Sequence, residues 1–327
     1  MVVYVKKQPI ADLKDGDVVN DIFVVKIKKG ISAYAKGYRF NLLLSDNTGK
    51  TVDYVYWGGQ DDARVNSLYN SITPDAVVNV QGKVSTYNGK LQLATNEPMM
   101  ITVLNDDEYS KGDFVKPQRK DVNVLYARLK EVVSSVVNPD IKRLLENIFN
   151  DPKVEQKFKI HPGAIEIHHN WIGGLLQHTL EVLDYCEISL KHHPSLDRDL
   201  LIAGALLHDI GKLEELEVTS RIKGTDRGQL AGHLILGTIY VTNMIGEISG
   251  FDEVLKNKII HMLVSHHGKV EYGSPKEPMF PEATILYYAD EMSSKTTEMV
   301  EFMELSKDET EDNFMYSRRN GRNMYLK

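Results

Sequence analysis

The spacing of the apolar residues changes once along the chain, and this change divides the sequence into two parts. In residues 1–104, short β-branched and aromatic segments alternate with turn signals such as Asn88-Gly89, a pattern typical of strands and hairpins. From residue 121 to about residue 305, apolar residues recur at three- and four-residue spacing, which indicates amphipathic helices. We therefore expect an all-β domain followed by an all-α domain.

The first part predicts a small closed sheet. Five strands are expected, at residues 21–28, 39–44, 51–57, 76–84 and 90–94. Segment 61–71 lies between the third and fourth strands, where an OB-fold inserts a short helix. We therefore predict an OB-fold barrel over residues 1–104.

The composition after the barrel predicts the remaining boundaries. Residues 105–120, NDDEYSKGDFVKPQRK, contain almost no aliphatic side chains, as is typical of a linker. A helical bundle is expected over residues 121–310 and a polar, loosely held tail over residues 311–327. The expected helices lie at 122–137, 140–149, 175–190, 197–209, 229–248, 251–267 and 281–305. Gly211 and Gly268 stand where C-terminal caps of helices belong.

Charge and cysteine content exclude some classes of protein. A formal charge of −7 argues against a protein that coats nucleic acid electrostatically, although it permits a local basic groove. The single cysteine, Cys186, lies in an apolar helical pattern and is expected to be a buried structural thiol. The sequence shows no membrane-spanning run and no signal peptide at the start, so we expect a cytoplasmic protein without a membrane partner.

Histidine is confined to one region of the chain. All 11 histidines lie between His161 and His267, and imidazole is the commonest metal-binding side chain. The pair His208-Asp209 follows an apolar helix directly, where a buried carboxylate needs a cation or several hydrogen bonds. Further histidine and aspartate residues lie in mostly apolar helices and should converge in the bundle core: His178, His233, His266, His267 and Asp290.

These side chains predict a site for divalent metal. The donor set contains nitrogen and oxygen but no thiolate, which suits manganese, iron, cobalt, nickel or zinc. One or two ions are expected, since Asp209 could bridge two ions, which would activate a water and stabilise the leaving oxygen of a displacement at phosphorus. The alternative is a set of unrelated side chains with local hydrogen bonds, and His233, His266 and His267 could instead support the ligands.

The order His178, His208-Asp209, Asp290 resembles the H…HD…D pattern of the HD phosphohydrolase superfamily. The segments GGLLQHT, LLHDIGKLEEL, GQLAGHLILG, LVSHHGKVEYGSPKEP and EATILYYADEM, after an OB-like domain, are similar to those of the YhaM-type 3′-5′ exoribonucleases. This resemblance covers almost the entire chain.

The resemblance implies a divalent-metal-dependent enzyme that removes nucleotides from the 3′ end of single-stranded RNA, with DNA as a second candidate. It implies an HD domain whose metals, manganese first, are held by His178, His208, Asp209, His233, His266, His267 and Asp290. Asp209 and Lys212 would be catalytic, with Lys212 a cationic partner for the scissile phosphate. The chain departs from the HD-GYP phosphodiesterases at GKVEYGSP, after His267, and at Gly174, where those enzymes tend to have a carboxylate. Cyclic dinucleotides and a third metal are therefore not expected.

Substrate contacts are predicted in both domains. His169 could contact the substrate or make a structural hydrogen bond. In the first domain, aromatic and basic residues interleave as base-stacking sites require, although aromatic residues also fill small barrels. The predicted contacts are Phe40, Tyr56, Trp57, Lys83, Tyr87 and Lys90.

Two other functions remain open. One is a phosphohydrolase of nucleotides or cyclic nucleotides, and the other is a single-strand-binding protein with a vestigial HD domain. The leucine-rich helix faces could form a subunit interface, so a homo-oligomer also remains open.

Overall fold

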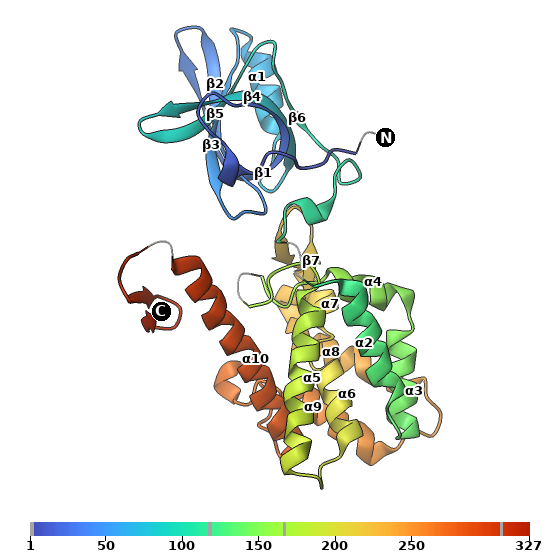
Figure 1. The fold of residues 1–327 in the computed structure, drawn as a ribbon. Helices are drawn as coiled ribbons and strands as arrows, with labels where there is room; N and C mark the ends of the chain where they lie inside the picture. Colours follow the sequence, from blue (N-terminus) through green and yellow to red (C-terminus); the bar gives the residue numbers. More distant parts are fainter. Residues whose placement is uncertain (1–2, 117–119, 166–167, 308–309) are drawn as a thin grey trace. The chain divides into compact units, whose positions relative to one another are not determined.

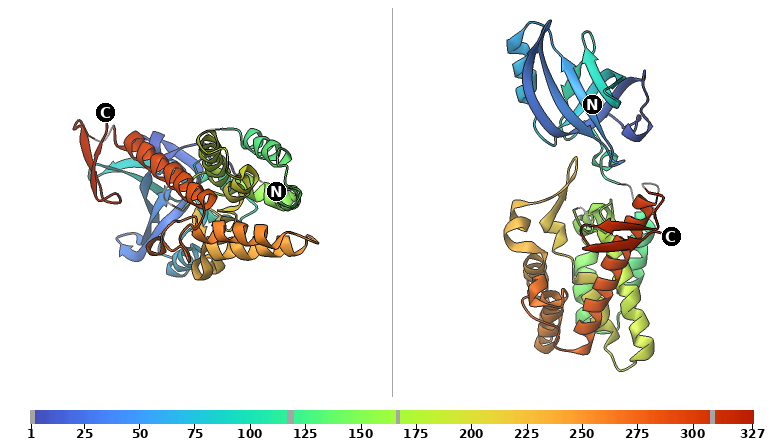
Figure 2. Two further views of the ribbon diagram at one scale, coloured as in Figure 1. Left: turned by 90° about the horizontal axis from the view of Figure 1, so that it is seen from below. Right: turned by 90° about the vertical axis from the view of Figure 1, so that its left-hand side faces the viewer.

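The computed structural model describes residues 3–116, 120–165, 168–307 and 310–327. Contacts divide the chain into two compact units, residues 1–117 with 218–222, and residues 118–217 with 223–327. The first unit is built from strands and the second mainly from helices (Figure 1, Figure 2). Among the described residues, a search for helices long and apolar enough to cross a membrane finds none.

Five strands of the first unit pair in a ring. They are β1 (Val18–Tyr34), β2 (Gly37–Ser45), β3 (Thr51–Trp57), β4 (Val77–Tyr87) and β5 (Lys90–Asn96). The antiparallel pairs β1–β2, β2–β3, β4–β5 and β1–β4 and the parallel pair β3–β5 close the circuit. Helix α1 (Asp62–Ser71) lies between β3 and β4 in sequence, and β6 (Ile101–Val103) adds to β4. This strand order, with a helix after β3, is OB-like.

Part of the predicted linker packs against this barrel. Tyr109 and Phe114 are buried with Ile22, Val24, Val77 and Leu104, and their own rings are 5.6 Å apart. The prediction of a linker was wrong for residues 105–116, because these two aromatic anchors offset the polar composition around them. Residues 117–119 lie outside the described residues.

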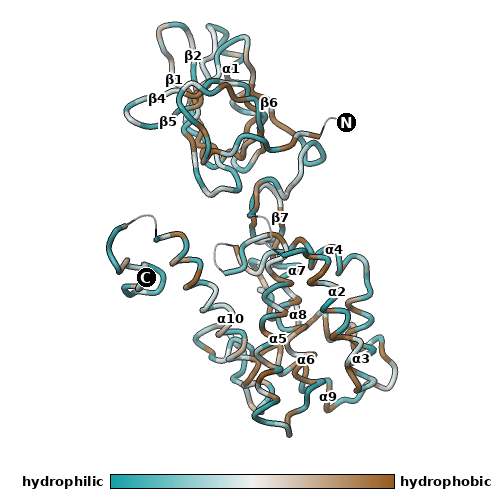
Figure 3. Tube along the Cα trace, viewed as in Figure 1, coloured by the Kyte–Doolittle hydropathy of each residue, from teal (hydrophilic) through white to brown (hydrophobic). Residues whose placement is uncertain are grey.

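Nine helices are described in the second unit. They are α2 (Val122–Ser134), α3 (Pro139–Phe149), α4 (Pro152–Ile160), α5 (Gly174–His192), α6 (Arg198–Leu207), α7 (Lys212–Glu215), α8 (Asp226–Gly246), α9 (Glu253–Ser265) and α10 (Pro281–Ser306). Aspartate or asparagine side chains cap several N-termini, as Asn138 does for α3 and Asp197 for α6, and satisfy amides that the helix leaves unpaired. Apolar residues recur along strands and helices alike (Figure 3).

Helix α6 is the central helix of the bundle. Every residue from Asp199 to Leu207 is buried, which is expected of a helix that is apolar nearly all round. It contacts α3, α5, α9 and α10. Because α6 ends at Leu207, the His208-Asp209 pair lies at the C-terminal end of this helix and is still buried.

The last residues form a hairpin instead of a loose tail. Strands β9 (Phe314–Ser317) and β10 (Arg322–Tyr325) pair antiparallel. Ser317, Met324 and Leu326 are buried, whereas Phe314, Tyr316 and Tyr325 are exposed. Buried and exposed residues alternate along these strands, whereas the polar composition of the segment had predicted a loosely held tail. A second short pair, β7 (Leu216–Val218) and β8 (Ile222–Gly224), follows α7.

Candidate metal centre

Five helices bring the predicted ligands to one place. His178 lies on α5, His208 caps the C-terminus of α6, His233 lies on α8, His266 caps α9 and Asp290 lies on α10. Asp209 and His267 follow the two capping histidines. The exposed fractions of His178, His208, Asp209 and His266 are 3% or less.

The first group of ligand atoms surrounds one oxygen of Asp209. His178, His208 and Asp290 form a group whose ligand atoms lie within 4.8 Å of one another. His178 Nε2 is 3.1 Å from Asp290 Oδ1 and 3.3 Å from His208 Nε2. Asp209 Oδ2 is 3.4 Å from His178 Nε2 and 3.3 Å from His208 Nε2.

The second group faces the other oxygen of the same carboxylate. His233, His266 and His267 again place ligand atoms within 4.8 Å of one another, and His233 Nε2 is 3.2 Å from His267 Nε2. Asp209 Oδ1 is 3.5 Å from His233 Nε2 and 3.7 Å from His266 Nε2. Asp209 therefore joins the two groups through its two oxygens.

Backbone carbonyls fix which nitrogen each ring offers. His208 Nδ1 donates to Ala205 O at 2.9 Å, and His266 Nδ1 donates to Leu263 O at 2.7 Å. His267 Nδ1 donates to Tyr272 O at 3.2 Å. A carbonyl oxygen can only accept, so these rings carry their hydrogen on Nδ1 and, when neutral, a lone pair on Nε2.

Two further rings are oriented by side chains. His178 Nδ1 donates to Ser293 Oγ at 3.0 Å, and this hydroxyl donates to Glu181 Oε2 at 3.0 Å. His233 Nδ1 is 3.0 Å from Glu215 Oε2. Such partners orient metal-binding imidazoles and raise their basicity. The sequence prediction missed Ser293, Glu181 and Glu215. Ser293 could have been predicted from its position, because it lies about one helical turn after Asp290.

Two glycines let the chain reach this geometry. Gly232 has φ 71° and interrupts α8 immediately before His233, a conformation that favours glycine. A Cβ on Gly211 would lie 2.0 Å from His233 O, so only glycine permits this close approach. Gly211 has φ −61° and precedes α7, so its predicted role as a C-terminal cap was wrong. Gly268, at φ 79°, has the left-handed conformation of such a cap.

The electrostatics keep both carboxylates ionised. Burial raises the pKa of Asp209, but Lys212 and His208 lower it more, and the net pKa lies well below the usual value. Burial raises the pKa of Asp290, but the hydrogen bond to His178 and the charges of His178 and His208 together lower it below the usual value. Burial lowers the pKa of His178, but Asp209 and Asp290 raise it to about 9. Burial, His267 and His208 lower the pKa of His266 well below its usual range, so that ring is neutral.

Lys212 forms an ion pair with Asp209. Its Nζ is 2.7 Å from Asp209 Oδ2 and donates to Gly163 O at 2.8 Å. Burial lowers the pKa of Lys212, but Asp209 raises it above the usual value, so the ammonium stays charged.

The residues fit a divalent metal ion. His266 Nε2 is buried and has no hydrogen-bond partner in the described residues, and leaving such a nitrogen unpaired costs free energy. The lone pairs of the neighbouring rings converge with an ionised carboxylate on the same space. Nitrogen and oxygen donors without thiolate suit borderline divalent metals.

His169 does not line the cleft beside these ligands. It is fully buried, and its Nε2 donates to Glu181 Oε2 at 2.9 Å. Its Nδ1 then carries the lone pair, so His168 Nδ1, 3.3 Å away, donates to it and His168 Nε2 becomes an acceptor. His169 therefore makes the structural hydrogen bond that was the alternative to a substrate contact, and its neighbour His168 lines the cleft.

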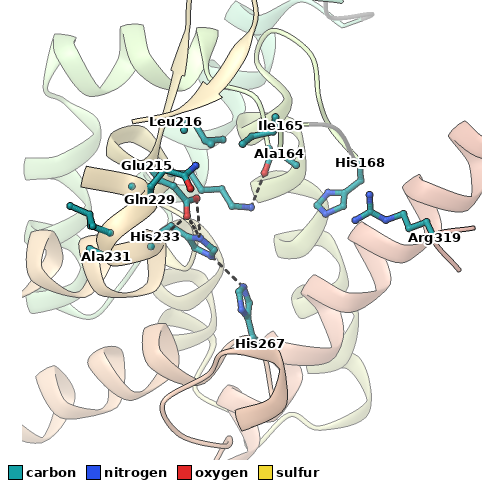
Figure 4. A pocket seen from close by; sticks show the side chains of 16 residues that line it. Ala164, Ile165, His168, Glu215, Leu216, Gln229, Ala231, His233, His267 and Arg319 are labelled. Atoms are coloured by element: carbon teal, nitrogen blue, oxygen red, sulfur yellow. Dashed lines mark hydrogen bonds and ion pairs between the residues drawn. The ribbon is translucent and has the colours of Figure 1, made fainter. Parts of the chain in front are cut away.

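A cleft of about 1050 Å³ opens onto the second group of ligands. His168, Lys212, Glu215, His233 and His267 line it together with Arg319 from the C-terminal hairpin (Figure 4). The cleft therefore gives a ligand direct access to the histidine cluster.

The six predicted contacts in the barrel divide into core and surface. The prediction was wrong for Phe40 and Tyr56, which are 0% and 5% exposed, because their rings stack in the barrel core with centroids 4.9 Å apart. Trp57 is partly exposed, with the Arg39 guanidinium 5.0 Å from its ring. Lys83, Tyr87 and Lys90 are exposed.

The chain is similar to several known proteins. The family described as "HD domain" matches residues 175–295. A curated relative, "3′-5′ exoribonuclease YhaM" from Geobacillus sp. (strain WCH70), is 33% identical over 287 residues, which cover 86% of this chain and 83% of the relative. An OB domain from Thermoplasma acidophilum is 17% identical with a TM-score of 0.23 and covers 30% of this chain and 85% of its own. The second OB-fold domain of replication protein A from Methanococcus maripaludis is 16% identical with a TM-score of 0.24 and covers 29% and 92%. By the identity and coverage of its curated relative, this chain belongs to the YhaM family of HD-domain exoribonucleases.

Proposed function

We propose that this protein is a divalent-metal-dependent 3′-5′ exonuclease that hydrolyses phosphodiester bonds of single-stranded RNA. The observation that carries the proposal is the Asp209 carboxylate, whose Oδ1 and Oδ2 face two separate groups of imidazole and carboxylate ligands. Membership of the family supports the reaction class. Manganese is the first ion to test, because the donor set suits it among other divalent metals.

Divalent ions bound to these ligands would lower the pKa of a water and stabilise the leaving oxygen. The chain's own residues prepare the site for this chemistry. Asp209 stays ionised because Lys212 lies 2.7 Å from its Oδ2. The Nδ1 anchors hold each Nε2 in place, so little reorganisation is needed when a substrate binds.

The cleft and the barrel each offer groups to a single strand. His168 Nε2 is an acceptor that a terminal ribose hydroxyl could use. In the barrel, Trp57 ends β3, whereas Tyr87 and Lys90 flank the turn between β4 and β5. These positions belong to the surfaces with which OB-folds bind oligonucleotides, and Tyr87 and Lys90 also line a hollow of about 270 Å³. We infer that Trp57, Lys83, Tyr87 and Lys90 contact the strand.

Degradation of end-labelled oligonucleotides tests the proposal. Single-stranded RNA and DNA, labelled at the 3′ or the 5′ end, are incubated with wild type and manganese, with Asp209→Ala, and with Asp107→Ala as a control at an exposed aspartate. We expect 5′-labelled RNA to shorten stepwise, the 3′ label to leave as mononucleotide, and activity to fall roughly 10³-fold or more in Asp209→Ala only. Survival of every oligonucleotide in the presence of metal-loaded wild type contradicts the proposal.

The same preparations decide between the remaining functions. Nucleotides and cyclic nucleotides are offered separately, and the metal content of each protein is measured. Hydrolysis of these small substrates without hydrolysis of oligonucleotides identifies a nucleotide phosphohydrolase. Binding of oligonucleotides by a protein that takes up no metal identifies a vestigial HD domain.

A further inference from the structure

We propose that Arg319, in the turn of the C-terminal hairpin, binds a backbone phosphate of the nucleic-acid substrate at the mouth of the cleft. The inference rests on the proposed function and adds to it a phosphate site outside the metal ligands. Arg319 lines the same cleft as His168, His233 and His267, although it lies 29 residues after Asp290 in the sequence.

The turn that carries Arg319 is fixed to α10. Ser317 is buried, and its Oγ accepts from Asn320 N at 3.2 Å. Asn320 Nδ2 also donates to Glu298 Oε1 on α10, at 3.4 Å. Buried Met324 and Leu326 anchor the second strand. A side chain presented by such a turn has a defined position, which lowers the entropy cost of binding a ligand.

The guanidinium of Arg319 contacts Glu298 through its Nε atom. Its Nε is 2.8 Å from Glu298 Oε1, and its side chain is 51% exposed whereas that of Glu298 is 9% exposed. A guanidinium has five donors in a planar fork. With Nε engaged by the carboxylate, the terminal amino groups remain to bind a phosphate through two parallel hydrogen bonds. Figure 4 shows the guanidinium beside His168, and both residues line the cleft.

The positive charge of Arg319 is more accessible to a ligand than that of Lys212. Among the described residues that line the cleft, these two are the cationic ones. Lys212 Nζ already contacts Asp209 Oδ2 at 2.7 Å and Gly163 O at 2.8 Å, and its side chain is 12% exposed. A polyanion that enters the cleft therefore meets the Arg319 guanidinium as its accessible positive charge.

The outward face of the hairpin favours a nucleic-acid strand over a small nucleotide. Phe314, Tyr316 and Tyr325 are each more than half exposed, because their positions alternate with the buried residues of the two strands. Exposed aromatic rings beside arginine are the combination that binds single strands, through base stacking and phosphate contacts.

Three variants test the phosphate site. Arg319→Ala removes the charge, Arg319→Lys keeps the charge without the fork, and Arg318→Ala removes a neighbouring exposed arginine that does not line the cleft. The measurements are kcat and KM for degradation of single-stranded RNA at several salt concentrations. In addition, fluorescence anisotropy measures the binding of RNA whose 3′-terminal linkages are phosphorothioates.

We expect Arg319→Ala to raise KM roughly tenfold with little change in kcat, because the contact is made equally in the ground and transition states. The slope of log affinity against log salt should become shallower by about 0.7, as for one lost phosphate contact on a single strand. Arg319→Lys should fall between wild type and Arg319→Ala, and Arg318→Ala should match wild type.

Several results overturn the phosphate site. The phosphate site is contradicted if Arg319→Ala and Arg318→Ala have equal effects. It is also contradicted if Arg319→Ala leaves both KM and the salt slope unchanged. A loss of kcat alone, or a change of oligomeric state in gel filtration, instead assigns the turn a structural or subunit-contact role. If wild type cleaves no RNA but binding still depends on Arg319, only the nuclease proposal fails. Arg319→Lys decides the question if Arg319→Ala does not fold.

Discussion

In the helical unit the predicted metal ligands are mostly buried polar side chains, whereas in the barrel the predicted aromatic contacts are divided between core and surface. His178 and Asp209 lie among apolar helices with almost no exposed surface. Phe40 and Trp57 lie on neighbouring paired strands, and Phe40 is completely buried whereas Trp57 is partly exposed.

The difference follows from the free energy of burial. A buried carboxylate or imidazole costs free energy unless a partner compensates for it, so a polar residue within an apolar helix signals a function. Burial of an aromatic ring is favourable in itself, so the same residue type serves the core and a ligand equally well. Sequence patterns are therefore more informative for the metal site than for the nucleic-acid surface.

The largest expected effect separates core from surface in the barrel. Phe40→Ala should lower the free energy of unfolding of this unit by about 3–5 kcal/mol, because it leaves a cavity against Tyr56. Trp57→Ala should change that free energy far less, while it weakens RNA binding by about 1–3 kcal/mol through a lost stacking surface. Urea unfolding and fluorescence anisotropy measure the two quantities. Equal destabilisation by both variants would place Trp57 in the core as well.

A smaller effect is expected where a hydroxyl orients a ligand in the helical unit. Ser293→Ala removes the acceptor of His178 Nδ1 and should weaken metal binding about 10- to 100-fold. The matched control is Ser294→Ala, because Ser294 Oγ donates, within the described part of the chain, to carbonyls of its own helix, Asp290 O and Glu291 O. Isothermal titration of the metal-free proteins with manganese measures the affinity. If both variants bind like wild type, the serine bond does not orient the ring.

The last expected effect, about tenfold per pH unit, concerns the pH dependence of metal binding. Asp209 and Asp290 raise the pKa of His178 to about 9 in the metal-free protein, so a metal must displace a proton there at neutral pH. Metal affinity should therefore rise about tenfold per pH unit from pH 7 and level off near pH 9. The carboxylates of Asp209 and Asp290 have lowered pKa values, so both stay ionised from pH 7 to pH 9. Titrations with metal at several pH values measure the slope of metal affinity against pH. The control variant His192→Ala, which changes an exposed histidine, should show the same slope as wild type. An affinity independent of pH contradicts a protonated His178.

The sequence predicted the elements that have a strong period and missed those defined by a few contacts. Helices α5, α6 and α10 were predicted within a few residues of their bounds, because their apolar faces recur over many turns. Helix α4 was missed, because only Val154 and Phe158 are buried in its nine residues. The C-terminal hairpin depends on small anchors in a polar context, so composition alone suggested a free tail.

The same limit applies to the site. Structural convergence of the predicted histidine and aspartate ligands follows from their placement in apolar helices. Glu215 and Glu181 could not be found in the same way, because each is partly exposed and acts through another element. Glu215 contacts His233 on α8, and Glu181 reaches His178 through Ser293 on α10. Their roles depend on which helices pack against one another, and the apolar period of a sequence does not predict this.

The capping histidines also have a consequence for protein design. His208 and His266 each end a helix and donate from Nδ1 to the carbonyl three residues earlier. That one bond satisfies a carbonyl at the helix end and orients the ring, so it requires no residue from another element. A helix that ends in such a histidine therefore orients the ring without help from other elements. A designer could add this helix to an unrelated bundle to direct a metal-binding nitrogen toward a chosen site.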